Sequence, residues 1–572
     1  MLKKNYLYLL LLYIVFWLCI PDISIGESQL EVSSNHQTQS EQNLIENIKC
    51  GFPLVLQANA PQNKDKLLRL QSTMLRLEQL DSVYMSPSGH FKIHYNNTGY
   101  NAIPSYDRNQ NSTPDYLEFV AKSFDRAWQI EIDSLGFKPP PDSSGNDREL
   151  YPIYCGPIPF YGQTYLDYEI PALPEINYVT HIEIHTDFSS LGVIYPGITD
   201  PIVRDSMAIA VTAAHEFNHA LQSGYRLWPK DDFFHDVWFI ESSATYMEEV
   251  VAGEVNDYLQ YLKYYFNKTR LPLDYSTGRF DYSTGGLMDY GKVVFPIMLG
   301  ELYGKDITRK VWNGIQQQRA LPSLENTLLN VNTDIKSEIV RLALWLYYTN
   351  EKATQEKYFP DAEYFPNVSL DSVSTNPIKS ELSELVSDSL PRLSFQWYLS
   401  KTNTPLTPNL LLKGKGNTLA EYLSGIYINL NDGGFFIFPA STGFTIPFDL
   451  SSKGLYYSVV NAYNTNILHF NFSLLAKPLS VIDKIRVYVY PQPLKLSNLQ
   501  PRLNFVNIPN DAEILIYSSN GRHLVTLRSS SDSPILFWDL RTQSGEKIGS
   551  GVYIFKMKSS SGDYSGKFVV VR

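Results

Sequence analysis

Cysteine is scarce in this chain of 572 residues, which contains only three, at positions 19, 50 and 155. So few cysteines exclude a disulfide-dense scaffold, and the fold must therefore depend on ordinary hydrophobic cores. Positive charge is also in short supply, because 48 Lys and Arg residues stand against 59 Asp and Glu residues, a net charge of −11. This acidic balance argues against nucleic acid as a partner, since phosphate binding needs a basic surface.

Long apolar runs are absent beyond the first 26 residues, and those residues have the pattern of a secretory signal peptide. Lys3 and Lys4 supply the basic start, residues 6–20 carry no charge, and residues 24–26 offer a cleavage site. An anchoring transmembrane helix is the alternative, but the run is short for a hydrocarbon core of about 30 Å. The mature chain is therefore expected to be secreted or to lie on the cell surface, with no transmembrane helix.

Removal of residues 1–26 would also remove Cys19 and leave Cys50 and Cys155 in an oxidising compartment. An even pair of cysteines in such a compartment predicts one disulfide between them. The alternative is a pair of free thiols.

Composition and patterning divide the rest of the chain, which at 44% hydrophobic residues is globular. Residues 27–85 are predicted to be a flexible leader followed by a helical segment, with helical spacing of apolar residues over 64–80. Residues 86–380 mix helices and strands and predict an α+β domain. Short alternating runs between turn residues then predict two β-sandwich domains, at 381–482 and 483–572.

The residues most suggestive of chemistry are His215-Glu216-Phe217-Asn218-His219. On a helix, His215 and His219 project from one face and can bind one Zn²⁺, while Glu216 can take a proton from metal-bound water. A helix is expected here, capped by Asp205 or Ser206 and ended by Gly224. The alternative is a pair of ordinary buried histidines on a core helix.

A catalytic zinc needs a third protein ligand, and a predicted helix with the pattern Trp238-x-x-Glu241-x-x-Ala244 follows shortly after. This arrangement resembles the gluzincin metallopeptidases, in their thermolysin-like and aminopeptidase branches. The resemblance implies a zincin-like catalytic domain in which His215, His219 and Glu241 bind zinc and Glu216 is the general base. Glu248 and Glu249 are the competing candidates for the third ligand, in place of Glu241. Otherwise they are expected to lie on a solvated face of the helix or to orient one of the histidines by a hydrogen bond.

Asp289-Tyr290-Gly291-Lys292 is similar to a Tyr-x-Lys segment of the aminopeptidase branch. That likeness makes Tyr290 the candidate that stabilises the oxyanion, against the alternative of a structural tyrosine. The Gly-x-Met-Glu-Asn motif with which that branch binds a free amino terminus is absent. Residues 180–185 instead predict the edge strand before the zinc helix, which could align an extended peptide, so endopeptidase activity is favoured.

Residues 107–118 place oxygen atoms at the spacing of an EF-hand-type loop. The candidate calcium ligands are Asp107, Asn109, Asn111, the carbonyl of Thr113, Asp115 and Glu118. Ser112 stands where glycine normally makes the sharp turn, and Pro114 is a second departure. A structural Ca²⁺ is predicted, with a plain Asn- and Asp-rich turn as the alternative.

The last 80 or so residues contain an Asn520-Gly521 hairpin signal, Trp538-Asp539-Leu540, and Gly-rich strand starts at 549–553 and 566–568. This order resembles the C-terminal sorting domain of type IX secretion cargo in the Bacteroidetes. The resemblance implies a small Ig-like sandwich, recognition by outer-membrane secretion machinery, and a Gram-negative bacterium as the organism that secretes the protein. A generic Ig-like binding module is the alternative.

Together these patterns predict a multidomain protein with an α+β zincin-like catalytic domain followed by two Ig-like β-sandwiches. The predicted activity is hydrolysis of protein or peptide substrates by a zinc-activated water. A non-catalytic surface adhesin or binding protein on a peptidase-like fold is the alternative from another class. A zinc-dependent esterase or other hydrolase would retain the metal and change the reaction.

Overall fold

A computed structural model describes residues 49–59, 80–171, 177–193, 195–227, 236–276, 286–354, 358–373, 382–400, 407–414, 422–428, 435–440, 443–445, 455–462, 467–477, 487–490, 494–495, 503–506, 508–509, 511–529, 535–560 and 562–571. The predicted signal peptide at 1–26 lies outside the described residues, as does the helix predicted at 64–80 except for its last residue. The described chain is a mixed α/β structure with several separate sheets.

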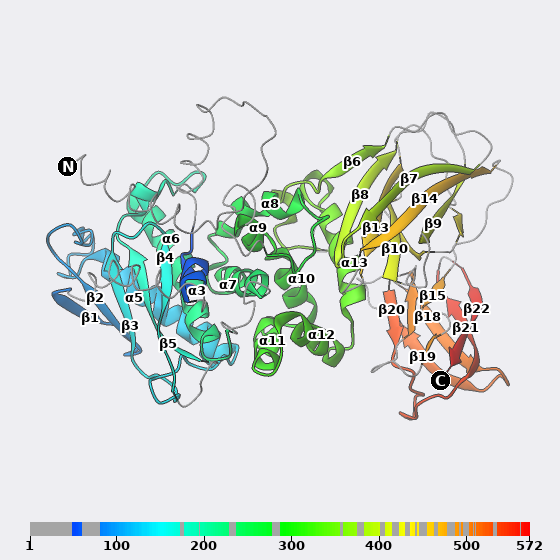
Figure 1. The fold of residues 1–572 in the computed structure, drawn as a ribbon, viewed down its shortest axis with the longest axis horizontal. Coiled ribbons are helices and arrows are strands. Elements are labelled where there is room, and N and C mark those ends of the chain that lie inside the picture. Colours follow the sequence, from blue (N-terminus) through cyan, green and yellow to red (C-terminus); the bar gives the residue numbers. More distant parts are fainter. Residues whose placement is uncertain are drawn as a thin grey trace, which may run out of the picture. The chain divides into compact units, whose positions relative to one another are not determined.

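The first sheet has five strands in the order β1-β2-β3-β5-β4 (Figure 1). Its strands are β1 (Ser82–Met85), β2 (Phe91–Tyr95), β3 (Tyr151–Gly156), β4 (Gly162–Glu169) and β5 (Tyr178–His185). The middle strands β2, β3 and β5 run parallel, and β1 and β4 are antiparallel to their neighbours.

The prediction that residues 180–185 form the edge strand is wrong. They belong to β5, which pairs with β3 on one side and with β4 on the other. Both faces of β5 are largely buried, as is typical of an inner strand. Strand β4 pairs antiparallel with β5 and with no other described strand of this sheet, so β4 is the edge strand at this end.

Two long helices pack against each other next to this sheet. Helix α6 (Pro201–Gln222) starts earlier than expected, because the Asp200 side chain accepts a hydrogen bond from Ile202 and Pro201 occupies the first turn. Its second half is buried throughout. Helix α7 (Val237–Ala252) is likewise almost fully buried and packs on α6. A helix that is buried all round depends on its position in the core.

Shorter helices complete this part of the chain. They are α3 (Phe52–Asn59), α5 (Asp115–Ala127), the π-helix η2 (Trp128–Ser134), η3 (Phe188–Leu191), η5 (Asp257–Tyr261), α8 (Leu262–Phe266), α9 (Gly286–Gly291), α10 (Val294–Tyr303), α11 (Ile307–Ile315), α12 (Ala320–Asn330), α13 (Ile335–Tyr347), η6 (Asn350–Lys352) and η7 (Ala362–Tyr364). Helix α3, drawn dark blue in Figure 1, lies beside β4. None of the helices within the described ranges is both long and apolar enough to cross a bilayer.

Two further sheets, with orders β11-β10-β13-β8-β6 and β12-β9-β14-β7, follow the helices. Their strands are β6 (Leu370–Val373), β7 (Leu382–Leu390), β8 (Ser394–Ser400), β9 (Thr407–Gly414), β10 (Leu423–Ile428), β11 (Phe435–Pro439), β12 (Gly443–Thr445), β13 (Leu455–Asn461) and β14 (Leu468–Lys477). Strand β6 precedes the predicted boundary at 381 yet pairs with β8. Trp397 of β8 also donates a hydrogen bond to the Ala343 carbonyl of α13, so the cores on the two sides of that boundary are continuous.

The last part of the chain has its own hydrophobic core and two sheets, β15-β17-β20 and β16-β22-β21-β18-β19. Its strands are β15 (Tyr488–Tyr490), β16 (Leu494–Lys495), β17 (Leu503–Val506), β18 (Glu513–Ser518), β19 (His523–Arg528), β20 (Ile535–Trp538), β21 (Gly551–Lys558) and β22 (Tyr564–Val571). The hairpin predicted from Asn520-Gly521 is confirmed: it joins β18 to β19, with Gly521 at a φ of +84°.

Candidate metal centre

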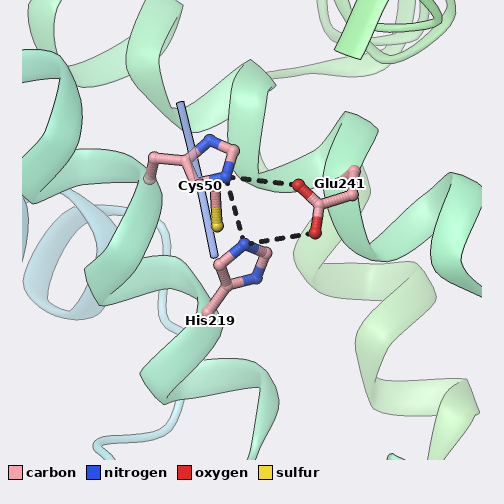
Figure 2. A group of neighbouring side chains, drawn as sticks. Cys50, His219 and Glu241 are labelled. Atoms are coloured by element: carbon pink, nitrogen blue, oxygen red, sulfur yellow. Dashed lines mark hydrogen bonds and ion pairs between the residues drawn. The ribbon is translucent and has the colours of Figure 1, made fainter. Parts of the chain in front are cut away.

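Four buried side chains converge between α6, α7 and the segment before α3. One donor atom from each of Cys50, His215, His219 and Glu241 lies within 4.8 Å of the other three, and Figure 2 shows Cys50, His219 and Glu241 of this group. The Nε2 atoms of the two histidines are 3.1 Å apart. The Glu241 oxygens lie 3.4 Å from Nε2 of His215 and 3.6 Å from Nε2 of His219. The structure thus brings the three zinc ligands suggested by the sequence together.

The local sequence explains this convergence. The four-residue spacing of His215 and His219 on α6 directs both imidazoles to one side of the helix. Glu241 lies in the second turn of α7, which packs on α6. Two rigid helices therefore fix three of the four donors.

The other ring nitrogen of each histidine has a partner that orients it. Nδ1 of His215 lies 2.7 Å from Oε1 of Glu248, and Nδ1 of His219 lies 2.9 Å from Oε1 of Gln222. The Gln222 amide nitrogen donates to Asn218, Ile240 and Ser243, so its oxygen is left to accept from His219. With the proton on Nδ1, the Nε2 lone pair faces the centre, as metal-binding histidines require. Glu248 is therefore a partner that orients His215, one of the roles considered for it from the sequence.

Electrostatics also suit a cation. Burial lowers the pKa of both His215 and His219, which favours the neutral imidazoles that bind metals. Burial, together with repulsion from Glu216, raises the pKa of Glu241. Neither Glu241 oxygen has a hydrogen-bond partner within the described residues. Burying a carboxylate without partners is costly, and a divalent ion would satisfy it. Two nitrogens, one oxygen and one sulfur form a donor set that fits zinc.

Glu216 lies beside this group. The Thr164 hydroxyl of β4 donates to Oε2 of Glu216 at 2.7 Å, which holds the carboxylate in place. Burial raises the pKa of Glu216 to about 7, although contacts with Cys50 and Thr164 lower it. A Cβ atom at Gly162 would come within 2.7 Å of the Glu216 side chain, so only glycine allows β4 to approach so closely.

Tyr290 also reaches the centre, from α9. Its ring centroid lies 5.8 Å from that of His215, and its hydroxyl donates a long hydrogen bond of 3.5 Å to the Cys50 carbonyl. Burial and the nearby Glu241 raise the pKa of Tyr290, so the hydroxyl keeps its proton and can donate it. The structure thus places this hydroxyl beside the three histidine and glutamate donors.

The predicted disulfide between Cys50 and Cys155 is wrong, because both residues are buried free thiols. Cys155 on β3 pairs with Ile184 on β5, and Ile184 pairs with Gly162 on β4. Cys50 pairs with Gly162 on the other side of the edge strand β4. Three strand spacings of about 4.8 Å separate the two cysteines by roughly 14 Å, too far for a disulfide. Cys50 could not be recognised as a donor from the sequence, because its neighbours form no ligand motif.

The predicted calcium loop is a compact turn before α5. Amide groups of Asn109 and Asn111 donate to Glu118, and Asp107 accepts from the backbone of Asn111 and Ser112. Ser112 has a φ of +72°, so it adopts the left-handed conformation for which glycine is usual at this loop position. Asp115 accepts from the backbone of Arg108. The loop is ordered by its own side chains, and calcium binding stays a prediction.

Comparisons with known proteins identify no family. No protein-family model matches the chain, and no curated protein matches it. Solved structures with similar segments include PorZ of Porphyromonas gingivalis, an essential bacterial surface component of the type-IX secretion system (20% identity over 20% of this chain, TM-score 0.15). Dimeric latent PorU of the same organism is similar over 29% of this chain (22% identity, TM-score 0.15). This chain covers only 15% of PorZ and 16% of PorU, so their activities do not transfer to it.

Proposed function

We propose that this chain is a secreted zinc-dependent peptidase, with endopeptidase activity favoured. The observation that carries the proposal is the Glu241 carboxylate. It is buried, has no hydrogen-bond partner among the residues that the structure describes, and lies beside two imidazole nitrogens that are 3.1 Å apart. Catalytic zinc sites are commonly formed by one carboxylate and two imidazoles, which leave the fourth coordination position of the ion for water or substrate.

The histidines, the glutamates and Tyr290 each have a role in this proposal. His215, His219 and Glu241 hold the ion, and Glu248 and Gln222 keep the imidazoles in the binding tautomer. Zinc, when bound, would supply Lewis acidity that lowers the pKa of a water molecule towards about 7. Glu216, oriented by Thr164, would accept a proton from the attacking water and later deliver it to the leaving amine. The Tyr290 hydroxyl donates to the oxygen of the scissile carbonyl as it gains charge.

The wider assignment follows from the sequence patterns. The α+β part of the chain would be a zincin-like domain, and the two β units would be Ig-like sandwiches. The last unit would direct export by type IX secretion machinery of a Gram-negative bacterium, which leaves the protein secreted or on the cell surface. The loop at 107–118 would bind a structural Ca²⁺.

Substitution of Glu216 by glutamine tests the activity. Glu216→Gln keeps the shape of the side chain but removes the base, so zinc content after dialysis should be unchanged while hydrolysis of casein or peptides falls at least about a hundredfold. Glu249→Gln, at a partly buried residue of α7 that is not part of the centre, is the matched control and should retain activity. Normal casein turnover by Glu216→Gln would contradict the proposal.

A non-catalytic surface binding protein is the competing function, and one observation favours it. Cys50 adds a fourth donor to the centre, and zinc with four protein ligands is typical of structural sites. Absence of hydrolysis in every variant that retains zinc, including those with Cys50 removed, would support this alternative.

A further inference from the structure

Residues 49–51 extend the first sheet at its open edge. The backbone N–H of Gly51 donates to the Gly162 carbonyl of β4 at 3.2 Å, and the N–H of Tyr161 donates to the Lys49 carbonyl at 2.9 Å. Cys50 pairs with Gly162 in an isolated parallel bridge. Addition of an extended segment to a sheet edge is a common way in which proteins bind peptides. The chain's own segment therefore occupies the edge on which an extended peptide would lie.

The side chains of this segment are also anchored in the centre. The Phe52 ring stacks on the His219 imidazole, with centroids 4.3 Å apart. Lys49 is buried and forms ion pairs with Glu248 and Asp257. A Cβ atom at Gly51 would lie 2.5 Å from Gln163 and 2.7 Å from Phe160, so the fit at this position requires glycine. Every residue from 49 to 52 thus contacts the edge strand or the centre.

The position of Cys50 determines what the segment does. Its sulfur is one of the four donors that lie within 4.8 Å of one another, and thiolate is a strong zinc ligand. The carbonyl of the same residue accepts the hydrogen bond from Tyr290. Cys50 therefore occupies both the fourth ligand position and the place of a carbonyl that Tyr290 could activate.

We propose that Cys50 is a fourth ligand of the bound zinc ion, and that residues 49–52 hold the chain in a latent form by filling the peptide-binding edge. Binding converts the thiol to a thiolate and releases one proton, with no oxidant or reductant. Displacement of the segment opens the fourth position and the edge of β4 together. The proposal has two halves. The latency half, in which residues 49–52 block the peptide-binding edge, rests on the proposed peptidase function. The ligand half, in which Cys50 binds zinc, does not depend on that function.

X-ray absorption at the zinc edge of the full-length chain tests the ligand half. The unmodified protein should show one sulfur at about 2.3 Å from zinc. Cys155→Ala, the matched control at the other buried free thiol, should retain this sulfur, and Cys50→Ala should lose it. A spectrum of the unmodified protein with nitrogen and oxygen neighbours alone would overturn the proposal, whatever the activity. This measurement needs no variant that must fold.

Peptide hydrolysis tests the latency half. If the segment is bound in about 90% of molecules or more, its release raises the rate about tenfold or more. Cys50→Ala should therefore cleave a fluorogenic peptide at least tenfold faster than the unmodified protein, and Cys155→Ala should match the unmodified protein. Phe52→Ala, which removes the stacking on His219, provides a second route to the same increase if Cys50→Ala does not fold.

The outcomes separate the two proposals. Equal activity of the unmodified protein and Cys50→Ala overturns latency while the peptidase assignment stands. A zinc–sulfur contact without hydrolysis by any variant supports the ligand half, overturns latency, and contradicts the proposed function, because the site would then be a closed structural one.

Discussion

Nδ1 of His215 lies 2.7 Å from Oε1 of Glu248, two helical turns beyond Glu241 on α7. One face of a single helix thus supplies both a candidate ligand and the residue that orients another ligand. Removal of such partners typically lowers metal affinity 10- to 100-fold. We therefore expect Glu248→Ala to weaken zinc binding by about that factor, measured by competition with a chelator of known affinity.

Glu249→Ala is the control for this experiment, because Glu249 is the neighbouring acid on the same helix and is not part of the centre. Its zinc affinity should equal that of the unmodified protein. Equal affinities for Glu248→Ala and Glu249→Ala would show that the contact with His215 contributes nothing to metal binding.

Tyr290 offers a test that separates catalysis from binding. Loss of a single oxyanion donor costs about 10²- to 10³-fold in kcat. In the Cys50→Ala background, Tyr290→Phe should therefore lower kcat by about that factor and leave zinc content unchanged. Steady-state kinetics with a peptide substrate provide the measurement.

Tyr261→Phe is the matched control for Tyr290→Phe. The ring of Tyr261 packs against that of Tyr290 with centroids 5.1 Å apart, but its hydroxyl has no hydrogen-bond partner among the described residues. It should keep kcat near that of the background protein. If both variants lose activity equally, ring packing rather than the Tyr290 hydroxyl is responsible.

The helix-borne part of the centre could be predicted from the sequence, because helical spacing alone places His215 and His219 on one face. The partner Glu241 followed from a nearby helix with a recognisable pattern. Cys50 could not be found this way, since it reaches the centre through backbone pairing with Gly162, far away in the sequence. Contacts of that kind depend on the order of strands, which local patterns do not encode.

Two of the wrong predictions, the disulfide and the edge strand, have the same physical origin. An even number of cysteines suggested a disulfide, but the sheet places β5 and β4 between Cys155 and Cys50. Residues 180–185 resembled an edge strand because they precede the predicted zinc-binding helix, whereas the antiparallel pairing of β4 with β5 places β4 outside β5. Spatial order in a mixed sheet is set by the packing of both faces and cannot be deduced from order along the chain.

Ser112 stores strain in the loop before α5. Its φ of +72° lies in the region that residues with a Cβ atom adopt at a cost of about 1–3 kcal/mol. Glycine adopts this φ without that strain, but it loses more conformational entropy on folding than serine does. Replacement of Ser112 by glycine therefore recovers only part of the cost. We expect Ser112→Gly to raise the free energy of unfolding by about 1 kcal/mol, measured in urea. Ser112→Ala keeps the Cβ atom and should bring no gain, so a gain of equal size there would contradict the role of strain.

Glu131 of η2 provides a pH-dependent test away from the candidate metal centre. It is fully buried, and one carboxyl oxygen accepts a hydrogen bond of 2.8 Å from the Asn218 amide of α6. Burial raises its pKa well above the ordinary 4.5, despite the opposing effect of that hydrogen bond. The folded state therefore keeps a proton that the unfolded state loses above about pH 4.5, and stability falls as pH rises towards the folded pKa.

Glutamine at this position cannot ionise and can still accept from Asn218. Glu131→Gln should therefore remove this part of the pH dependence, with a gain in thermal midpoint that is small at pH 4 and grows towards pH 8. Thermal unfolding of the metal-free protein at several pH values measures the difference. Asp133→Asn, at an exposed carboxyl on the same π-helix, is the control and should shift the midpoint little at any pH. A gain for Glu131→Gln that is constant with pH would show that the buried carboxyl has no raised pKa.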